Sequence, residues 1–242
     1  MPARHYDLTD KHVIVTGGSR GIGFHTARAF AEAGCRVSIT ARDEHALAQA
    51  AGRIGDRCRW YVCDQADPEA VTAMAQRVVE ADGPPDVLVA NAGGGWGGGN
   101  HVVDMPLDQW RKTIDTNLTG TFCVCKALLP GMIERQRGDV FLISSMSGKK
   151  GDPGSAAYAA SKFGLQGFAQ ALTHEVRRAN VRVMVLNPSG VNTEPDDTSP
   201  PDGPGQTLHA ADLATLMVDL ARLPGRTLVR DMDIWGTNPF RG

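Results

Sequence analysis

The chain has 242 residues, of which 42% are hydrophobic and 21% are charged, and its formal net charge at pH 7 is −2. This length suits one large domain with a substantial core, and no linker-like segment divides residues 1–242. The nearly balanced charge provides no broad basic field, so nucleic acid and membrane surfaces are not expected partners. A small-molecule substrate fits this charge balance better.

The sequence also bears on the cellular compartment. It contains no run of about twenty apolar residues, and residues 1–11 are polar, so we expect neither a membrane span nor a secretory signal. The five cysteines form no metal-like array with histidines, and an odd number does not suit a disulfide framework. We therefore expect a cytoplasmic protein with reduced thiols and no metal site.

Apolar segments of strand length alternate with amphipathic segments of helix length along the chain. Each return to a parallel strand requires a crossover, so this alternation predicts a doubly wound parallel sheet of the Rossmann type, an α/β fold with helices on both faces. The expected strands are Val13–Val15, Arg36–Thr40, Trp60–Cys63, Val87–Ala90, Asp139–Ile143, Arg182–Leu186 and Met232–Trp235. The expected helices are Gly21–Ala33, Glu44–Ile54, Pro68–Asp82, Leu107–Arg135, Ala156–Arg178 and Asp212–Leu223.

A glycine-rich segment directly follows the first expected strand. Gly17, Gly21 and Gly23 there allow a tight turn, close approach of a pyrophosphate to the backbone, and contact between helix and strand. The first turn of the following helix offers N–H groups to phosphate. This position in a βαβ unit predicts a dinucleotide site.

The end of the second expected strand indicates which dinucleotide is bound. An acidic residue there would bind the adenosine ribose and repel a 2′-phosphate, but Ala41 takes that position and Arg42 follows it. Arg42 and Arg20, in the glycine segment, supply guanidinium groups suited to bidentate phosphate contact. The sequence therefore favours NADP(H) over NAD(H).

Tyr158 and Lys162 lie four residues apart in the expected helix over 156–178, and so share one of its faces. With a bound cofactor, an ammonium close to a phenol lowers a phenol pKa that begins near ~10, and such a phenol can exchange a proton near neutral pH. Ser145 precedes Tyr158 by thirteen residues and ends an apolar strand. Taken alone, a tyrosine at a helix start is commonly a half-buried core residue, so the interpretation depends on its companions.

Those companions are the glycine segment, Asn91-Ala92-Gly93 after an apolar strand, and Asn117 within the expected helix over 107–135. With Ser145, Tyr158 and Lys162 they resemble, in order and spacing, the short-chain dehydrogenase/reductase family over nearly the whole chain. The resemblance implies hydride transfer between a nicotinamide and a carbonyl or alcohol substrate.

The resemblance also implies the role of each residue. Ser145 would hydrogen-bond the substrate carbonyl while Tyr158 gives it a proton. Lys162 would lower the tyrosine pKa and reach the nicotinamide ribose, and Asn117 would hold a water that links Lys162 to solvent.

Further residues are implied for the cofactor. Asp64 would meet the adenine edge, and the segment 187–193 is similar to the family's Pro-Gly-x-x-x-Thr segment, although Ser189 replaces the usual glycine. The complete expected set is Gly17, Ser19, Arg20, Gly21, Ile22, Gly23, Arg42, Asp64, Asn91, Ala92, Gly93, Tyr158, Lys162, Pro188, Val191 and Thr193.

Three functional interpretations remain open. The first is an NADP(H)-dependent reductase of ketones or aldehydes, with alcohol oxidation as its reverse. The second is a 3-oxoacyl thioester reductase, for which the ending at 233–239 departs from the glycine-rich pattern we associate with that group. The third is a noncatalytic NADP-binding partner protein, which an altered tyrosine or lysine would have favoured.

Two loops and two helices carry further expectations. Residues 94–100, with Trp96 among glycines, and residues 194–205 should flank the substrate, but their composition does not identify it. The expected helices over 107–135 and 156–178 have apolar positions on more than one side. This pattern predicts a homodimer or homotetramer.

Overall fold

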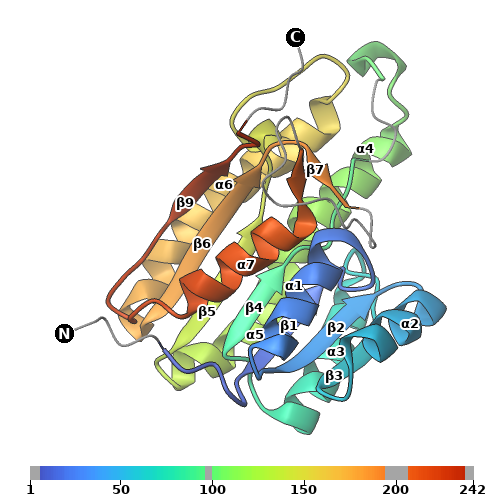
Figure 1. Ribbon diagram of the computed structural model, residues 1–242. Helices are drawn as coiled ribbons and strands as arrows, with labels where there is room; N and C mark the ends of the chain where they lie inside the picture. The colour runs from blue at the N-terminus through green and yellow to red at the C-terminus, as the bar shows by residue number, and fades with distance from the viewer. Residues whose placement is uncertain (1–5, 96–99, 194–206, 238–242) are drawn as a thin grey trace.

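The computed structural model describes residues 6–95, 100–193 and 207–237, and a seven-stranded parallel sheet lies at its centre (Figure 1). Its strand order, β3-β2-β1-β4-β5-β6-β9, confirms the predicted doubly wound α/β fold. The sheet strands are β1 (His12–Thr16), β2 (Arg36–Ala41), β3 (Cys58–Val62), β4 (Val87–Ala90), β5 (Gly138–Ile143), β6 (Val181–Pro188) and β9 (Asp231–Ile234). A short ladder joins β7 (Val191–Asn192) to β8 (Leu208–His209). The helices are α1 (Gly21–Glu32), α2 (Glu44–Ile54), α3 (Pro68–Asp82), α4 (Leu107–Ile114), α5 (Gly120–Glu134), α6 (Ala156–Val176) and α7 (Ala210–Ala221).

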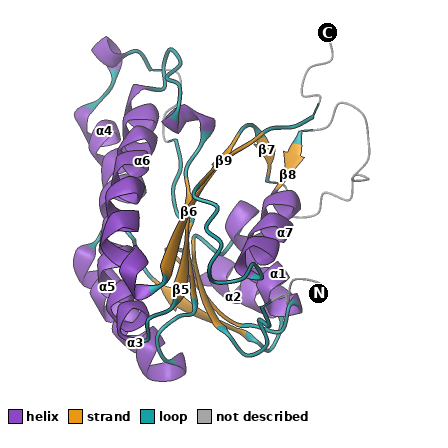
Figure 2. Ribbon diagram, turned by 90° about the vertical axis from the view of Figure 1, so that its left-hand side faces the viewer, coloured by secondary structure: helices purple, strands orange, loops and turns teal. Residues whose placement is uncertain are grey.

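Helices cover both faces of the sheet (Figure 2). On one face lie α3, α4, α5 and α6, and on the other lie α1, α2 and α7. Buried side chains such as Leu128 and Leu165 fill the first interface, whereas Phe24 and Met217 help to fill the second. Because both faces are covered, the central strands are apolar along nearly their whole length.

The order of the strands reverses between β1 and β4. From β1 the chain first adds β2 and β3 on one side, and then returns to place β4 on the other side. Ligands of such sheets bind beyond the carboxyl ends of the strands at this switch point. The predicted site residues are attached to this edge.

The long helix expected over 107–135 contains an irregular turn. Between α4 and α5 the backbone forms a π-helical turn, η2 (Asp115–Thr119), where the N–H of Gly120 donates to the carbonyl of Asp115. In a regular α-helix that N–H would bond to Thr116. The expectation of an uninterrupted α-helix was therefore wrong at these residues.

Helix α7 begins two residues earlier than expected. The carboxylate of Asp212 accepts a hydrogen bond from the N–H of His209 at 2.8 Å, so this aspartate caps the helix from inside its first turn. Asp212 had been expected to start the helix.

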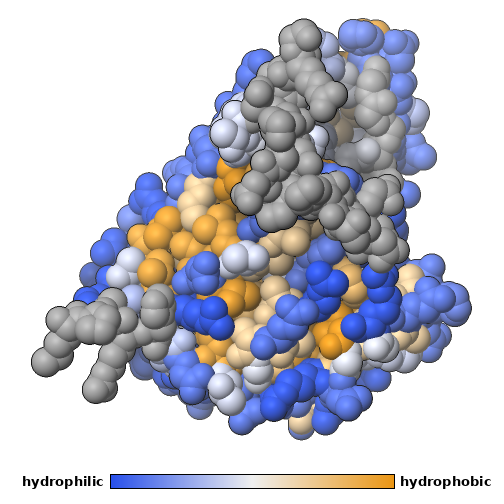
Figure 3. Space-filling model, in the orientation of Figure 1, coloured by the Kyte–Doolittle hydropathy of each residue, from blue (hydrophilic) through white to orange (hydrophobic). Residues whose placement is uncertain are grey.

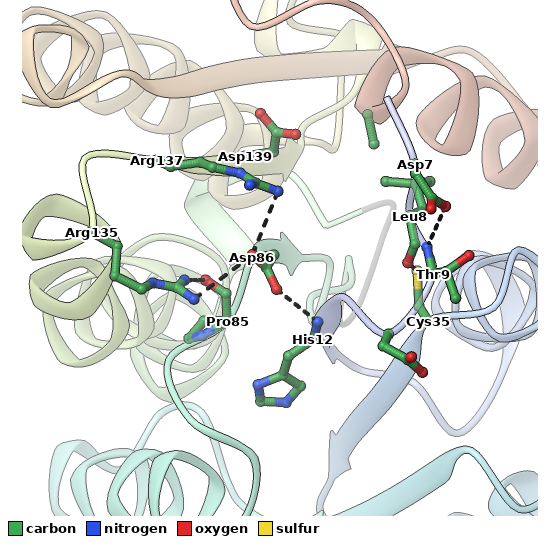
Figure 4. A network of polar contacts seen from close by, with 12 residues as sticks. Asp7, Leu8, Thr9, His12, Cys35, Pro85, Asp86, Arg135, Arg137 and Asp139 are labelled. Atoms are coloured by element: carbon green, nitrogen blue, oxygen red, sulfur yellow. Dashed lines mark hydrogen bonds and ion pairs between the residues drawn. The ribbon is translucent and has the colours of Figure 1, made fainter. Parts of the chain in front are cut away.

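Polar residues gather at the opposite, amino-terminal edge of the sheet (Figure 4). Asp86 accepts a hydrogen bond from the N–H of His12 at 2.9 Å, and the guanidinium groups of Arg135 and Arg137 lie 3.7 and 3.8 Å from its other oxygen. Arg135 also donates to the carbonyl of Pro85 at 2.5 Å. These contacts fasten the start of β1 to the segments that precede β4 and β5.

Arg182 and Asp139 form a buried ion pair between β5 and β6. The guanidinium donates to both carboxylate oxygens, at 2.6 and 2.8 Å, and the side chain of Arg182 is only 9% exposed. Burial raises the pKa of Asp139, while the bonds from Arg182 act in the opposite direction. The same guanidinium donates to the carbonyls of Leu223 and Thr227, so one buried charge also holds the segment after α7.

Removing the charge of Asp139 should destabilise the protein without changing its site. Asp139→Asn leaves the buried guanidinium uncompensated, so we expect the free energy of unfolding to fall by about 3 kcal/mol in urea titrations. The matched control is Asp219→Asn, because Asp219 is 65% exposed and lies 3.7 Å from Arg222. Its expected change is below about 0.5 kcal/mol. Equal losses in the two variants would contradict this account.

Candidate active site

Asn91 fastens the glycine loop to the end of β4. Its side-chain amide donates to the carbonyls of Thr16 and Gly17 at 2.9 and 3.3 Å, and the N–H groups of Asn91 and Ala92 donate to the Thr16 hydroxyl at 3.1 and 3.0 Å. Gly17 has a φ of 68°, and a Cβ on it would lie 2.9 Å from the Cα of Ala92. Only glycine fits this crossing of the two loops.

The start of α1 has the shape expected of a phosphate cradle. A Cβ on Gly23 would lie 2.3 Å from the carbonyl oxygen of Gly17, so the helix packs directly against the loop backbone. The first turn of α1 contains no acidic residue, and its N–H groups have no partners within the helix. Thr193 approaches from the other side, 3.3 Å from a Cβ built on Gly21. These residues fit the pyrophosphate of a dinucleotide.

The expected adenosine contacts lie along the same edge. Gly18 donates to the carbonyl of Thr40 at 3.1 Å, which brings the glycine loop to the end of β2. Arg20 precedes the first residue of α1, Arg42 follows β2, and both are exposed. Asp64 is half-buried just after β3. Each arginine therefore follows this backbone contact between the glycine loop and β2 by two residues.

Ser145 and its neighbour Ser144 face different partners. The Ser145 side chain lies close enough to Tyr158 to lower the pKa of its phenol, and its hydroxyl accepts a hydrogen bond from the N–H of Ser147 at 3.1 Å. The Ser144 hydroxyl is buried, accepts from the amide of Gln166 at 3.2 Å and lies 3.4 Å from the carbonyl of Lys162. Of the two serines, only Ser145 is thus placed beside the tyrosine.

The protein environment raises the pKa of Tyr158. Burial is the main cause, and the hydrogen bond from Ser145 acts in the opposite direction. The ammonium of Lys162 lies 5.6 Å from the centroid of the tyrosine ring. The expected lowering of the phenol pKa referred to a site with cofactor bound, whereas the protein groups alone keep the phenol protonated. A protonated phenol is the form that donates to a carbonyl oxygen.

Lys162 carries its ammonium into the protein interior. The residue is only 5% exposed, and its Nζ donates to the carbonyl of Ile143, the last residue of β5, at 2.7 Å. Burial lowers the pKa of Lys162 to about 8. Near neutral pH this residue is mostly charged, but its lowered pKa reduces the free energy needed to remove its proton.

Asn117 lies beside Lys162 through the π-helical turn. Its Oδ1 accepts from the N–H of Gly94 at 3.0 Å, and its Nδ2 donates to the carbonyl of Gly94 at 3.0 Å and to the hydroxyl of Ser161 at 2.9 Å. A Cβ on Gly93 would lie 2.9 Å from Oδ1 and 3.7 Å from the Nζ of Lys162. The asparagine thus connects the loop after β4 to α6.

Ser161 was not singled out in the sequence. It accepts from Asn117 and donates to the carbonyl of Tyr158 at 2.7 Å. The sequence could have indicated Ser161 by its position, three residues after Tyr158 and one before Lys162, because residues three apart on a helix are neighbours.

The remaining expected residues divide between described and undescribed parts of the chain. Pro188 ends β6, Val191 lies in the β7–β8 ladder, and Thr193 meets the glycine loop. Trp96 and the second substrate loop, 194–205, lie outside the described residues.

The described residues contain no cluster of three or more histidine, cysteine or acidic side chains able to hold a metal ion. None of their helices combines the length and apolar character needed to cross a bilayer.

Comparison with known proteins gives consistent results. A sequence model described as short chain dehydrogenase matches residues 11–202. The 3-oxoacyl-[acyl-carrier-protein] reductase FabG of Chlamydia muridarum is 38% identical over 191 residues, which cover 77% of this chain and 76% of the relative. A putative ketoacyl reductase of Streptomyces coelicolor is 37% identical over 185 residues, which cover 74% of this chain and 70% of the relative.

Solved structures agree with these matches. A metagenomic short-chain oxidoreductase in complex with NADP has a TM-score of 0.83 and 33% identity, and the match covers 95% of this chain and 98% of that one. A variant of the actinorhodin polyketide ketoreductase with NADPH has a TM-score of 0.85 and 29% identity, with 95% and 97% covered.

The buried ammonium predicts a pH-dependent difference in stability. The pKa of Lys162 falls from 10.5 to about 8 on folding, so the unfolded chain binds more protons between these values and the free energy of unfolding rises with pH across the interval. Lys162→Met removes this contribution. We expect the stability of the unaltered protein relative to this variant to stay constant below the folded pKa, and then to rise by on the order of 3 kcal/mol.

Urea unfolding at a series of pH values measures this difference. The control is Lys150→Met, because Lys150 is 80% exposed and its charge remains in water. A flat difference for Lys162→Met would contradict the burial of its charge.

Proposed function

The chain belongs to the short chain dehydrogenase family, and from this premise we propose that it is an NADP(H)-dependent oxidoreductase that interconverts a ketone or aldehyde and an alcohol. The observation that carries the proposal is the placement of Tyr158 between Ser145, which lowers its pKa, and the buried ammonium of Lys162, 5.6 Å from its ring centroid. These groups lie at the carboxyl end of β5, on the edge of the sheet that also bears the glycine loop.

The proposed chemistry follows from what each side chain can donate. Ser145 and Tyr158 direct hydroxyl hydrogens toward one carbonyl oxygen, where negative charge develops during reduction. Tyr158 then transfers its proton, and the ammonium of Lys162 stabilises the phenolate that remains. NADPH supplies the hydride when bound. Alcohol oxidation uses the same groups in reverse.

We propose a positioning role for Asn117. Both atoms of its amide already have protein partners, in Gly94 and Ser161. A water that links Lys162 to solvent would find only the second lone pair of Oδ1 on this side chain. We assign to Asn117 mainly the placement of the backbone of Gly93 and Gly94 beside Lys162.

The proposed cofactor is NADP(H). The exposed Arg20 and Arg42 support it, since both suit a 2′-phosphate, and Ala41 offers no carboxylate to repel one. The NADP and NADPH named in the titles of the similar structures point the same way.

A 3-oxoacyl thioester reductase is the second candidate. It is favoured by the similarity to the 3-oxoacyl-[acyl-carrier-protein] reductase of Chlamydia muridarum over 76% of that relative. A noncatalytic NADP-binding partner protein is disfavoured, because Ser145, Tyr158 and Lys162 are all present and adjacent.

We also propose that the protein assembles as a homodimer or homotetramer. On α4, α5 and α6, large apolar side chains are exposed, among them Trp110 at 37%, Phe122 at 46% and Phe163 at 47%. On the opposite face, apolar surface gathers around α7 and the edge strand β9 (Figure 3), and Trp235 is 57% exposed after that strand. Two separate apolar areas support a tetramer built from two kinds of contact.

The proposed location is the cytoplasm. All five cysteines are free. Burial raises the pKa of Cys35, Cys58 and Cys125 to about 12 and that of Cys63 to about 11, which keeps these thiols protonated and unreactive. Such thiols suit a reducing compartment.

Tyr158→Phe tests the activity. The variant retains the ring but loses the proton donor, so kcat should fall by about 10³-fold while the Kd for NADPH changes less than about threefold. Oxidation of NADPH is followed by absorbance against ketones, aldehydes and 3-oxoacyl thioesters, and the thioesters decide between the two candidate substrate classes. The matched control is Tyr61→Phe, a buried tyrosine on β3. Undiminished turnover in Tyr158→Phe would refute the assigned role.

Arg42→Ala tests the cofactor preference. Loss of a charge-assisted contact to the 2′-phosphate should raise the Kd for NADPH about tenfold and change that for NADH less than about twofold. Calorimetry measures both constants. Arg226→Ala, which alters an exposed arginine between α7 and β9, should change neither. Equal weakening of both cofactors by Arg42→Ala would remove the basis for the preference.

A further inference from the structure

The buried side chain of Gln65 connects the loop after β4 to the π-helical turn η2. It follows Asp64 after β3 and is only 5% exposed. Its Nε2 donates to the carbonyl of Ala92 at 3.1 Å and to the carbonyl of Thr116 at 2.7 Å. Since both partners are acceptors, the amide must present its nitrogen to them, and the reverse orientation is excluded.

The π-helical turn explains why the Thr116 carbonyl takes a side-chain donor. In an α-helix this carbonyl would accept from the N–H of Gly120. In η2 that N–H bonds to Asp115 instead, so Thr116 loses its α-helical partner. The amide of Gln65 supplies a donor at that position, which a buried carbonyl requires.

Gly120 gives Gln65 the room to reach the turn. A Cβ on Gly120 would lie 2.4 Å from the side chain of Gln65 and 2.5 Å from its carbonyl oxygen. The residue whose N–H shifts to the π register is therefore also the residue that must lack a side chain. The π-helical register of the turn and its contact with Gln65 therefore both depend on Gly120.

The bonding of Gln65 is otherwise incomplete. Its Oε1 is buried and has no hydrogen-bond partner among the described residues. A methionine or leucine would fill the same volume without this unfavourable term. The unsatisfied Oε1 of Gln65 therefore accompanies an Nε2 that makes two hydrogen bonds, which methionine or leucine could not make.

The consequence concerns Asn117, which directly follows Thr116. A one-residue change of register turns the side chains of a helix relative to their neighbours, and Asn117 needs its present direction to bond Gly94 and Ser161. We propose that Gln65 is a positioning residue that holds the π-helical turn so that Asn117 faces the site beside Lys162. For catalysis this inference rests on the proposed carbonyl reduction.

Gln65→Met tests the inference, because it keeps the volume and removes the donor. Gln76→Met, on the exposed face of α3, is the matched control. We expect kcat to fall about tenfold, with the Kd for NADPH changed less than about threefold. In an Asn117→Ala background the same substitution should lower kcat less than about twofold, because the two residues act through one contact.

Amide hydrogen exchange gives a readout that does not require turnover. In Gln65→Met, peptides covering residues 113–121 should exchange about tenfold faster, and peptides of α3 should not change. If the unaltered protein reduces no carbonyl compound, the proposed function fails, while exchange in this turn still decides whether Gln65 holds it. Unchanged exchange would overturn the inference. Faster exchange with undiminished kcat in an active enzyme, or additive effects with Asn117→Ala, would also overturn it.

Discussion

The burial of one ammonium group organises the site. Lys162 places its Nζ against the carbonyl of Ile143, and a charge so far from water must keep this hydrogen bond. Ile143 ends β5 and the chain continues into Ser145, so the bond fixes α6 relative to the strand that delivers the serine. One turn earlier on α6, Tyr158 then meets Ser145. A single buried charge thus sets the relation between the helix, the strand end and the pair of hydroxyl groups.

Residues next to Ser145 and Lys162 hold the elements together. Gln166, one turn after Lys162, donates to Ser144 and to Asn187 at 3.2 and 2.5 Å. Asn187 in turn donates to Asp231 on the edge strand at 2.5 Å. A continuous polar chain therefore runs under the site from β5 through α6 and β6 to β9. Of the two neighbouring serines, Ser145 lies beside Tyr158 and Ser144 takes part in this polar chain.

The sequence predicted more of the fold than of the local geometry. Alternation of apolar segments located each of the seven strands of the main sheet along the chain, because burial on both faces leaves a strong pattern. The π-helical turn left no such pattern: one extra residue within a helix hardly alters hydrophobic spacing, and Asn117 and Gly120 are unremarkable helix residues in isolation. Gln65 was missed for a related reason, because its partners Ala92 and Thr116 are backbone carbonyls distant in sequence. A sequence shows which side chains form a motif, but it does not show which backbone carbonyls will need a side-chain donor.

The two edges of the sheet differ in how well their polar groups are satisfied. At the amino-terminal edge, the ring of His12 lies 2.9 Å from the carbonyl of Gly83 and 3.1 Å from the hydroxyl of Ser38, and the Arg182–Asp139 pair makes two direct bonds. At the carboxyl-terminal edge, burial lowers the pKa of Lys162 to about 8, and the Oε1 of Gln65 has no partner among the described residues. Unfavourable terms of this kind persist only where the surrounding structure holds them in place. That support is local: the carbonyl of Ile143 accepts from Lys162, and the carbonyls of Ala92 and Thr116 accept from Gln65, so these bonds keep the ammonium and the π-helical turn in place.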